Sequence, residues 1–553
     1  MTPKVENNPS CAICKMTNDL KACSACGLVY YCNSEHQKEH WKEHKTECIA
    51  YKIIDDKNSI YIEAARDIKA GSVVLSENPL VIGPDWSYDL FDTASTLNCV
   101  GCFEPIRVLN HRCQKCSWPC CNVACIGLEN NKLHEIECAF LKCGVGVKKQ
   151  GDYGAIRDYY RTDVLLALKC LLLQIKSKKK FEQLMKLNGN VKERKGGDDF
   201  RRAEKHIDYL EENFLKPLKE AEEKSGKILL PQKDRKTLQK IYGIIDRNAV
   251  YLTEKNEIAG LYSLGSTVTH SCVPNSHFIY DRKNAFKLTV KAIRDIKKGE
   301  IITTCFGNIL FGTQARKHQL AITKFITCNC IRCNDPTELG TNFSSLKCIG
   351  VDDGEECGGI QVPKVNKETN DLEWLCDKCP ARVSGAEISD LMTKMDEEID
   401  NTLSTEATVP AIENLMGKLA HFLHPNHFHL FTLKHALVQL YGNHRDYPFE
   451  SMTVENLKRK IKYCDELLEA IEKLDPKCVR LSFYMAVVLY EKCNGIRELM
   501  NRRANGNNYS KTDGLKLLKK AQMTIKYELD SMQGKNLNEN INDAIDVWQK
   551  IEN

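Results

Sequence analysis

The sequence predicts a multidomain α+β protein in which small metal-stapled modules flank a β-rich domain and a long helical region follows. Three observations support this fold class. Cysteine and histidine pairs at short spacings occupy residues 11–138 and return at residues 272–379. Runs rich in β-branched residues, which are typical of strands, lie between these clusters. Beyond about residue 385 cysteines become sparse and apolar residues recur at helical spacing.

Length and composition indicate a globular chain of several domains. The 553 residues are too many for one ordinary core, and 42% hydrophobic with 28% charged residues argues against global disorder. A net charge of +5 gives little support for a dedicated nucleic-acid binder. The first residues lack an apolar signal, and we find no run of about 18 apolar residues, the minimum for a membrane span. We therefore expect a cytoplasmic and/or nuclear protein in which the closely paired cysteines, among 28 in the chain, bind zinc rather than form disulfides.

Residues 11–48 contain eight candidate zinc ligands in four pairs. Each pair has a spacing that lets both side chains reach one tetrahedral metal. So short a segment cannot form a stable core without a metal. His40 fits no pair, and we expect it to be a solvated helix residue. The candidate ligands are Cys11, Cys14, Cys23, Cys26, Cys32, His36, His44 and Cys48.

A second eight-ligand set follows two predicted strands. These strands lie within residues 60–82 and are joined by a turn at residues 69–71. Cys120 competes with Cys121 for one ligand position, and Cys121 is preferred because it reproduces the spacing of Cys32 and His36. The second set is Cys99, Cys102, Cys113, Cys116, Cys121, Cys125, His134 and Cys138.

Residues 155–246 are predicted to be helical. The run 163–173 is almost wholly apolar and predicts a buried helix, and residues 203–225 show amphipathic spacing. The basic run 176–180 is either a recognition patch or, as we prefer, a solvated helix end.

A strand, a polar segment and two further strands are predicted next, at residues 259–262, 269–275, 285–293 and 301–306, with a turn at 298–300. Four cysteines beyond them form another four-thiolate candidate, namely Cys348, Cys357, Cys376 and Cys379. Amphipathic helices then extend to the end of the chain, as in an irregular TPR-like repeat. They are predicted at 387–400, 409–423, 428–441, 454–474, 479–492 and 514–533.

Two motifs resemble known domains. His270-Ser271-Cys272 with Pro274-Asn275, followed by Gly299-Glu300, resembles the C-terminal half of a SET domain, the fold of protein-lysine methyltransferases. The pairs in residues 11–48 resemble a MYND finger. One finger before a split SET domain and a second one inside it resemble the arthropod-type, SmydA-like branch of the SET and MYND domain-containing (SMYD) family. The resemblance covers about residues 11–380.

The resemblance implies how the ligands and domains are arranged. In the first finger the pairs interleave, so that Cys11, Cys14, Cys32 and His36 share one zinc and Cys23, Cys26, His44 and Cys48 the other. Cys328, Cys330 and Cys333 are implied to bind a post-SET zinc together with Cys272. The expected domains are a MYND finger (1–50), the N-terminal half of the SET domain (51–95), a second finger (96–140), a helical SET insert (141–250), the C-terminal SET half (251–312), a post-SET zinc region (313–385) and the helical TPR-like domain (386–553).

The family also implies a cofactor, S-adenosyl-L-methionine (SAM). Its implied contacts are Asn248, Ser266, Thr269 and His270, and the implied catalytic position is Phe306. Four positions depart from active relatives: Thr269 replaces an Asn, Phe306 and Phe325 replace Tyr, and residues 56–60 lack the Gly-x-Gly motif. A shifted register would bring Tyr262 or Tyr280 into the Tyr role. His270 is either a cofactor contact or a hydrogen-bonded core histidine.

Two functions follow from the resemblance. The first is a SAM-dependent protein-lysine N-methyltransferase acting on histone and/or non-histone lysines, with a role in transcriptional regulation. The alternative is a catalytically weak or inactive scaffold whose fingers bind proline-rich proteins, through aromatics such as Tyr30, Tyr31 and Trp41, and whose helical tail recruits a corepressor or chaperone. Zinc-dependent DNA binding is a weaker third hypothesis because the finger spacing differs from DNA-reading fingers. We expect a monomer.

Overall fold

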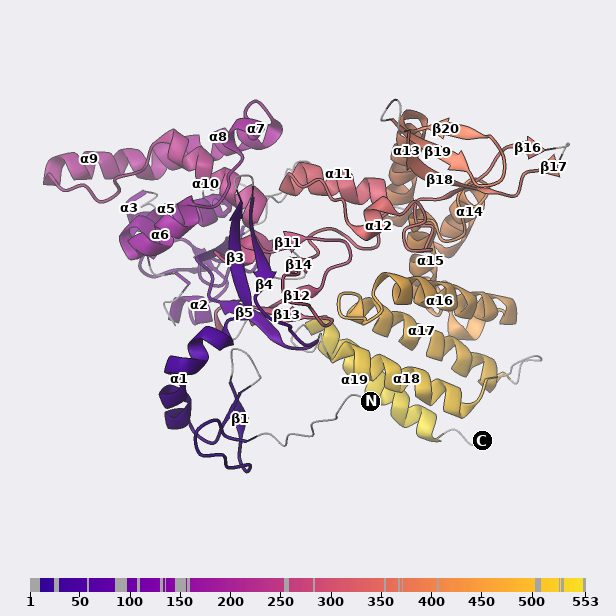
Figure 1. Ribbon diagram of the computed structural model, residues 1–553. Coiled ribbons are helices and arrows are strands. Elements are labelled where there is room, and N and C mark those ends of the chain that lie inside the picture. Colours follow the sequence, from indigo (N-terminus) through magenta and orange to yellow (C-terminus); the bar gives the residue numbers. More distant parts are fainter. Residues whose placement is uncertain are drawn as a thin grey trace. The chain divides into compact units, whose positions relative to one another are not determined.

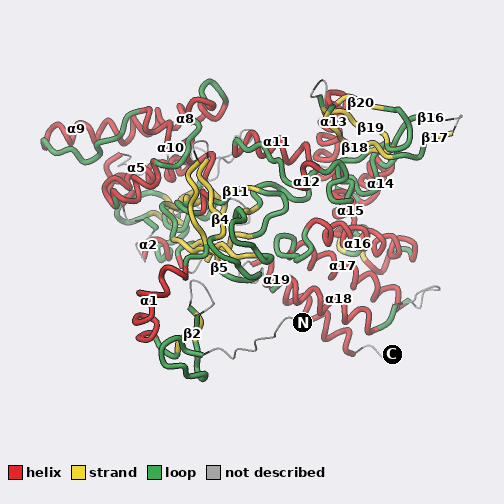
Figure 2. The backbone as a smooth tube through the Cα atoms, in the orientation of Figure 1, coloured by secondary structure: helices red, strands yellow, loops and turns green. Residues whose placement is uncertain are grey.

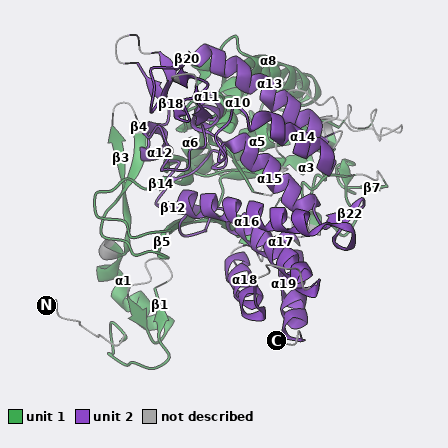
Figure 3. Cartoon of the chain, turned by 90° about the vertical axis from the view of Figure 1, so that its right-hand side faces the viewer, with its two compact units in different colours: residues 1–269, 278–303, 322–325 green, residues 270–277, 304–321, 326–553 purple. Residues whose placement is uncertain are grey.

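The computed structural model divides the chain into two compact units. Unit 1 contains residues 1–269, 278–303 and 322–325, and unit 2 contains residues 270–277, 304–321 and 326–553 (Figure 3). The structure describes residues 10–23, 29–56, 59–84, 97–106, 110–129, 133–134, 136–144, 156, 160–252, 258–281, 284–352, 355–366, 369, 371–404, 407–502, 509–526, 528 and 532–550. Among these residues, no helix combines the length and apolar character that crossing a membrane requires.

Unit 1 contains small antiparallel sheets (Figures 1 and 2). Strands β3 (Tyr51–Asp56) and β4 (Ser59–Ala64) form a hairpin. A second sheet has the order β6 (Val81–Pro84), β10 (Ile258–Leu261), β9 (Val250–Tyr251). A third has the order β12 (Ser276–Asp281), β13 (Lys287–Ala292), β5 (Val73–Glu77).

Two turns of these sheets need glycine. Gly71 and Gly299 have φ angles of +82° and +83°, in the left-handed region that residues with a Cβ rarely adopt. Both lie in the turns that the sequence predicts. The predicted strand 301–306 is corrected, because only β14 (Thr303–Thr304) is regular strand there.

Helices form the rest of the unit 1 core. Helix α5 (Leu165–Lys176) buries eight side chains, as its apolar sequence predicts. Helices α3 (Ile136–Gly144), α6 (Lys178–Met185) and α10 (Arg235–Asn248) pack against it. Helices α7 (Val191–Arg194) and α8 (Asp198–Leu210) contact α10, and α9 (Lys216–Ser225) contacts α3. Ser177 caps α6, and Lys178 and Lys179 are exposed. The basic run 176–180 therefore lies at the solvent-exposed ends of α5 and α6, where the two helices meet.

Unit 2 joins a small sheet to a helical array. The sheet order is β15 (Leu346–Lys347), β18 (Ile360–Val365), β19 (Leu372–Cys376), β20 (Arg382–Ser384), with a separate hairpin of β16 (Val351–Asp352) and β17 (Glu355–Glu356). The helices are α11 (Thr313–Lys324), most of which lies in unit 2, α12 (Ile331–Asn334), α13 (Gly385–Ser404), α14 (Val409–Leu419), α15 (Phe428–Leu440), α16 (Val454–Leu474), α17 (Ser482–Asn501), α18 (Lys511–Ile525) and α19 (Met532–Lys550).

Successive helices of the array pack on one another and share one apolar core, which confirms the α+β class with a helical C-terminal region. The expected helix 514–533 is corrected: α18 ends at Ile525 and a separate α19 follows. The Trp548 ring of α19 packs against Gly514 of α18. The contact is so close that a Cβ added to Gly514 would lie 2.2 Å from a ring atom.

Protonation of buried histidines should destabilise the helical array in acid. Burial lowers the pKa values of His429 and His435 to about 4, with Asp396 3.6 Å from His429 and Tyr484 stacked on His435 at 4.1 Å. A histidine in the unfolded chain has a pKa near 6.5, so the unfolded chain binds protons at a higher pH than the folded protein does. The free energy of unfolding therefore decreases as the pH falls from about 6.5 towards 4, by up to roughly 3 kcal/mol for each histidine.

Hydrogen exchange of α15 and α17 at pH 7 and pH 5, corrected for intrinsic rates, measures this effect. We expect faster exchange at pH 5, and a smaller difference in the His435→Leu variant. Equal corrected rates at the two pH values in the wild type would contradict the prediction.

Candidate functional site

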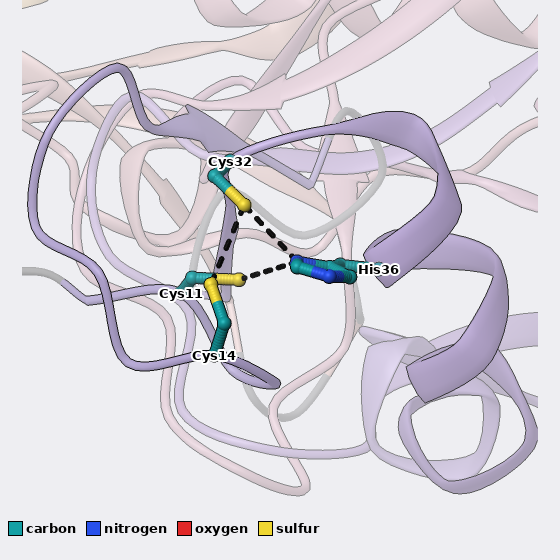
Figure 4. Close-up of side chains that lie close together, drawn as sticks. All are labelled: Cys11, Cys14, Cys32 and His36. Carbon is teal, nitrogen blue, oxygen red and sulfur yellow. Dashed lines mark hydrogen bonds between the residues drawn. The ribbon is translucent and has the colours of Figure 1, made fainter.

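The first four-residue cluster lies at the start of the chain. The structure brings the ligand atoms of Cys11, Cys14, Cys32 and His36 within 4.8 Å of one another (Figure 4). The Nδ1 atom of His36 lies 3.0 Å from the sulfur of Cys32 and 3.5 Å from that of Cys11. Asn33 accepts a hydrogen bond from the His36 N–H at the start of α1 (Ser34–Cys48), which places His36 in the first helical turn.

The partner set of this finger is partly described. The sulfurs of Cys23 and Cys48 are 3.8 Å apart and His44 is buried beside them, whereas Cys26 lies outside the described residues. The expectation of a solvated His40 is corrected. The His40 side chain is 21% exposed, and its Nδ1 lies 3.0 Å from the Tyr31 hydroxyl.

The second finger contains two clusters with interleaved pairs. One consists of Cys99, Cys102, Cys121 and Cys125, and the other of Cys113, Cys116, His134 and Cys138, each within 4.8 Å. Cys121, not Cys120, joins the first cluster. Hydrogen bonds from the Cys102 side chain and from backbone N–H groups outweigh burial and lower the pKa of Cys99 to about 5, so this sulfur is held as a thiolate, the form that binds metals.

The two fingers differ in what they pack against. The first has its own small core of Cys23, Tyr31 and Cys48. The second is part of the large core of unit 1, together with α5. Its Trp118 is fully buried and contacts the ring of Tyr160 at 5.3 Å. The second finger is therefore a structural element of the core.

A carboxylate orients the histidine of this buried finger. Glu137 lies 3.4 Å from Nδ1 of His134, and its other partner is Lys169 on α5, at 2.8 Å. Burial opposes ionisation of Glu137, but Lys169 and His134 outweigh it and lower its pKa to about 2. The other ring nitrogen, Nε2, lies 3.5 Å from the sulfur of Cys116, so it is the atom available to a metal.

We expect Glu137→Gln to weaken metal binding by the second finger about 10–100-fold, because the amide removes the negative charge that orients His134 and pairs with Lys169. Competition with a coloured chelator measures the metal affinity. Glu220→Gln, at an exposed position of α9, is the matched control. Identical metal release from the two variants would show that the carboxylate has no such role.

A third type of cluster lies in unit 2. Cys272, Cys328, Cys330 and Cys333 come together within 4.8 Å. Arg316, which is fully buried, donates to the sulfur of Cys333 at 3.6 Å. Arg316 also donates to the buried carboxylate of Glu338, at 2.6 Å, and this carboxylate accepts from Arg332 at 3.0 Å. A positive charge therefore sits beside the thiolates and is itself held by a buried carboxylate.

Next to this cluster, His270 contacts Phe306. The His270 Nδ1 accepts a hydrogen bond from the backbone N–H of Phe306 at 3.0 Å, and its Nε2 lies 3.5 Å from the sulfur of Cys272. The two rings stack with centroids 5.9 Å apart. Burial lowers the pKa of His270 to about 4, so the ring is neutral and carries its proton on Nε2. Both ring nitrogens have contacts within the protein, which favours the core-histidine interpretation.

The other expected cofactor residues belong to unit 1. The Asn248 amide donates to the carbonyls of Asn188 and Ile244, at 2.9 and 3.0 Å. The Ser266 hydroxyl donates to the Tyr262 carbonyl at 2.5 Å. Thr269 is exposed, and its backbone N–H donates to Ile302. In the segment that lacks Gly-x-Gly, Lys57 and Asn58 lie outside the described residues.

The alternative tyrosines differ from the family Tyr in their surroundings. The Tyr262 hydroxyl donates to the carbonyl of Phe286 at 2.5 Å inside the SET core, so its proton is already committed. Tyr280 packs beside it with ring centroids 5.9 Å apart. Phe325 is half-buried.

The fifth cluster lies at the sheet of unit 2 and consists of Cys348, Cys357, Cys376 and Cys379. Two glycines make room for the sulfurs: a Cβ on Gly359 would lie 2.5 Å from the sulfur of Cys376, and one on Gly350 2.9 Å from that of Cys379. Backbone N–H groups of Gly350 and Lys378 donate to two of the sulfurs, at 3.2 and 3.3 Å. Sulfur donors in this arrangement fit a structural zinc.

Replacing one cysteine of this cluster should remove one zinc ion per chain. Three sulfurs bind zinc more weakly than four, so we expect Cys379→Ser to lose that ion on dialysis. Cys478→Ser is the control, since that thiol lies 3.2 Å from the Met485 sulfur and belongs to none of the five clusters named above. Elemental analysis of both purified proteins gives the count, and an unchanged zinc content in Cys379→Ser would refute the site.

Several functional contacts were not expected from the sequence. Glu137 follows His134 by three residues, and a carboxylate so close in sequence to a ligand histidine was a usable signal. Cys333 and Glu338, the partners that link Arg316 to the cluster, are 17 and 22 residues from it in the sequence, and no spacing rule links them.

Comparisons with known proteins agree with this organisation. A MYND finger model matches residues 11–48 and a SET domain model matches residues 161–307. The SET domain-containing protein SmydA-8, isoform A, of Drosophila melanogaster is 23% identical over 417 residues, covering 74% of this chain and 81% of the relative. Histone-lysine N-methyltransferase ASHR1 of Arabidopsis thaliana is 23% identical over 441 residues, covering 76% and 82%.

Shorter and weaker similarities also occur. Human histone-lysine N-methyltransferase SMYD3 is 36% identical over 74 residues, 13% of this chain and 17% of that protein. A solved SET domain of LSMT, bound to lysine and AdoHcy, aligns with a TM-score of 0.25 at 11% identity, covering 93% and 90%, and adds nothing to the argument. The chain thus combines a MYND finger match with a SET domain match, and it is similar to SmydA-8, a SET domain-containing protein, along most of its length.

Proposed function

We propose that the protein is a SAM-dependent protein-lysine N-methyltransferase acting on lysines of histones and/or other proteins. The observation that supports this most is the alignment with ASHR1, a protein named as a histone-lysine methyltransferase, over 82% of its length. The zinc-type cluster around Cys272 adds support, since it stabilises the His270–Cys272 segment that carries the SET motif. In the proposed role the protein works in the nucleus and/or cytoplasm as a monomer.

Methyl transfer to lysine requires an uncharged amine in line with the donor. SAM supplies, when bound, the methyl group carried on its sulfonium sulfur. A free lysine has a pKa near 10.4, so a desolvated site must favour loss of its proton. We assign SAM binding to Asn248, Ser266 and Thr269 of unit 1. The exposed Thr269 hydroxyl, a donor and an acceptor, fits the polar parts of such a cofactor.

Phe306 limits this activity. Its ring stacks on His270 but has no hydroxyl with which to orient the substrate amine. The Tyr262 hydroxyl is bonded to the Phe286 carbonyl and does not replace it. We therefore propose slow turnover, because positioning supplies much of the catalysis in this reaction.

A second function, a scaffold with little or no turnover, is favoured by the same residue and by the first finger. Trp41 on α1 is 39% exposed and Tyr30 is half-buried, so both offer aromatic surface to a proline-rich protein segment. Tyr31 is buried in the finger core and takes no part. In this role the helical array would hold a corepressor or chaperone.

Calorimetric titration of the zinc-loaded protein with SAM separates the two functions. We expect wild type and Phe306→Tyr to bind with similar micromolar affinity, and Phe306→Tyr to methylate a histone substrate roughly tenfold faster or more, because it restores one hydrogen bond in the transition state. Phe325→Tyr is the control for adding a hydroxyl to a nearby aromatic position. Absence of heat from every variant would exclude the enzyme and leave the scaffold.

A further inference from the structure

The helical array and the SET motif share one compact unit. Residues 270–277, which contain His270-Ser271-Cys272, and residues 304–321, which contain Phe306, group with the helices of unit 2. The loop between α16 and α17 provides a contact between the array and the motif.

This loop is built to hold one arginine in place. The carboxylate of Asp475, 2% exposed, accepts hydrogen bonds from the backbone N–H groups of Arg480 and Leu481, at 2.7 and 2.9 Å. The same carboxylate also pairs with the Arg480 guanidinium at 3.7 Å, but the two backbone bonds do not require an arginine side chain at this position. Cys478, with a φ of +47°, lies within the loop and makes a tight turn there.

The Arg480 side chain spans from the array to the motif. Its guanidinium donates to the carbonyl of Leu474, at the end of α16, at 2.9 Å. It also donates to the carbonyl of Cys272 at 3.1 Å. The side chain is 13% exposed, so both bonds are largely shielded from water. The planar guanidinium of Arg480 thus links the end of α16 to Cys272. The sulfur of Cys272 belongs to the four-cysteine cluster that includes residues 328–333.

Hydrogen bonds continue from Cys272 towards Phe306. The backbone N–H of Ser271 donates to the carbonyl of Thr304 at 2.8 Å. The N–H of Phe306 donates to His270 at 3.0 Å. The neighbours of Cys272 make these two hydrogen bonds, so a displacement of the Cys272 carbonyl is passed on to the bonds that align the motif with the proposed catalytic position.

We propose that Arg480 is a positioning residue, through which the helical array sets the geometry of the His270–Cys272 segment and of Phe306. Its effect on cofactor affinity rests on the proposed function, whereas its effect on the segment does not. The array is then part of the machinery of the SET motif, and a protein bound to α16 or α17 acts on that motif through this loop.

Hydrogen exchange of the full-length, zinc-loaded protein tests the proposal through the amides of Ser271 and Phe306. In Arg480→Met we expect both amides to exchange about tenfold faster, because a hydrogen bond from a charged group is lost. Arg480→Lys should recover part of the protection, since lysine can reach one of the two carbonyls. Exchange in α16 and α17 should stay unchanged, because Asp475 holds the loop backbone.

A matched control is Arg502→Met. Arg502 also donates to backbone carbonyls of the array, those of Phe449 and Met452, and pairs with Glu498 at 2.7 Å. We expect this variant to leave the Ser271 and Phe306 amides unchanged. Equal exchange of these amides in wild type and Arg480→Met would overturn the proposal, as would a uniform increase across α16 and α17, which would show a purely structural role.

SAM titration of the same proteins separates this proposal from the proposed function. If the wild type binds SAM, we expect Arg480→Met to raise the Kd about tenfold and Arg502→Met to leave it unchanged. A wild type that shows no SAM binding would refute the proposed function, while the exchange rates would still decide the role of Arg480.

Discussion

Attraction between a divalent cation and clustered thiolates is the interaction on which this structure depends. Among the described residues of the first finger, the hydrophobic cluster contains three buried side chains, Cys23, Tyr31 and Cys48, two of which are candidate ligands. Without a metal, such a module would expose most of its apolar surface and repel its own thiolates. The same attraction joins Cys272 to residues 328–333, so that segments distant in sequence are held at one point.

Buried charged side chains beside the metal clusters offset the charge of those clusters. Four thiolates around a divalent cation carry a net negative charge, which is costly to bury unless it is compensated. Arg316 supplies a positive charge beside Cys333, and Glu338 fixes the position of that arginine. In the second finger the signs of the charges are exchanged. The carboxylate of Glu137 lies next to the ligand His134, and Lys169 pairs with that carboxylate. Each case joins a metal cluster to a neighbouring helix.

The parts of the fold that sequence reasoning predicted are those governed by local chemistry. Ligand spacing identified the cysteine and histidine pairs, and the resemblance to a MYND finger implied that the pairs interleave. Helical periodicity placed α16 at Val454–Leu474. Strand β3 was missed because four of its six residues are exposed and it lacks alternation. Helix α19 was missed because it is rich in Asn, a weak helix former, although Leu537, Ile541, Ala544 and Trp548 repeat on one face. Contacts such as Arg480 with Cys272 join residues too distant for any local pattern.

The different surroundings of the two fingers have a consequence for how the chain acquires its structure. The sulfurs of the second finger are part of the same core as α5, so this core cannot close around an empty site. Metal uptake at residues 99–138 and collapse of the core are therefore a single cooperative event. The first finger, with its separate core, can exchange its metal while the rest of the chain stays folded. Loss of zinc from the second finger therefore affects the whole core around α5, whereas loss of zinc from the first finger affects that finger alone.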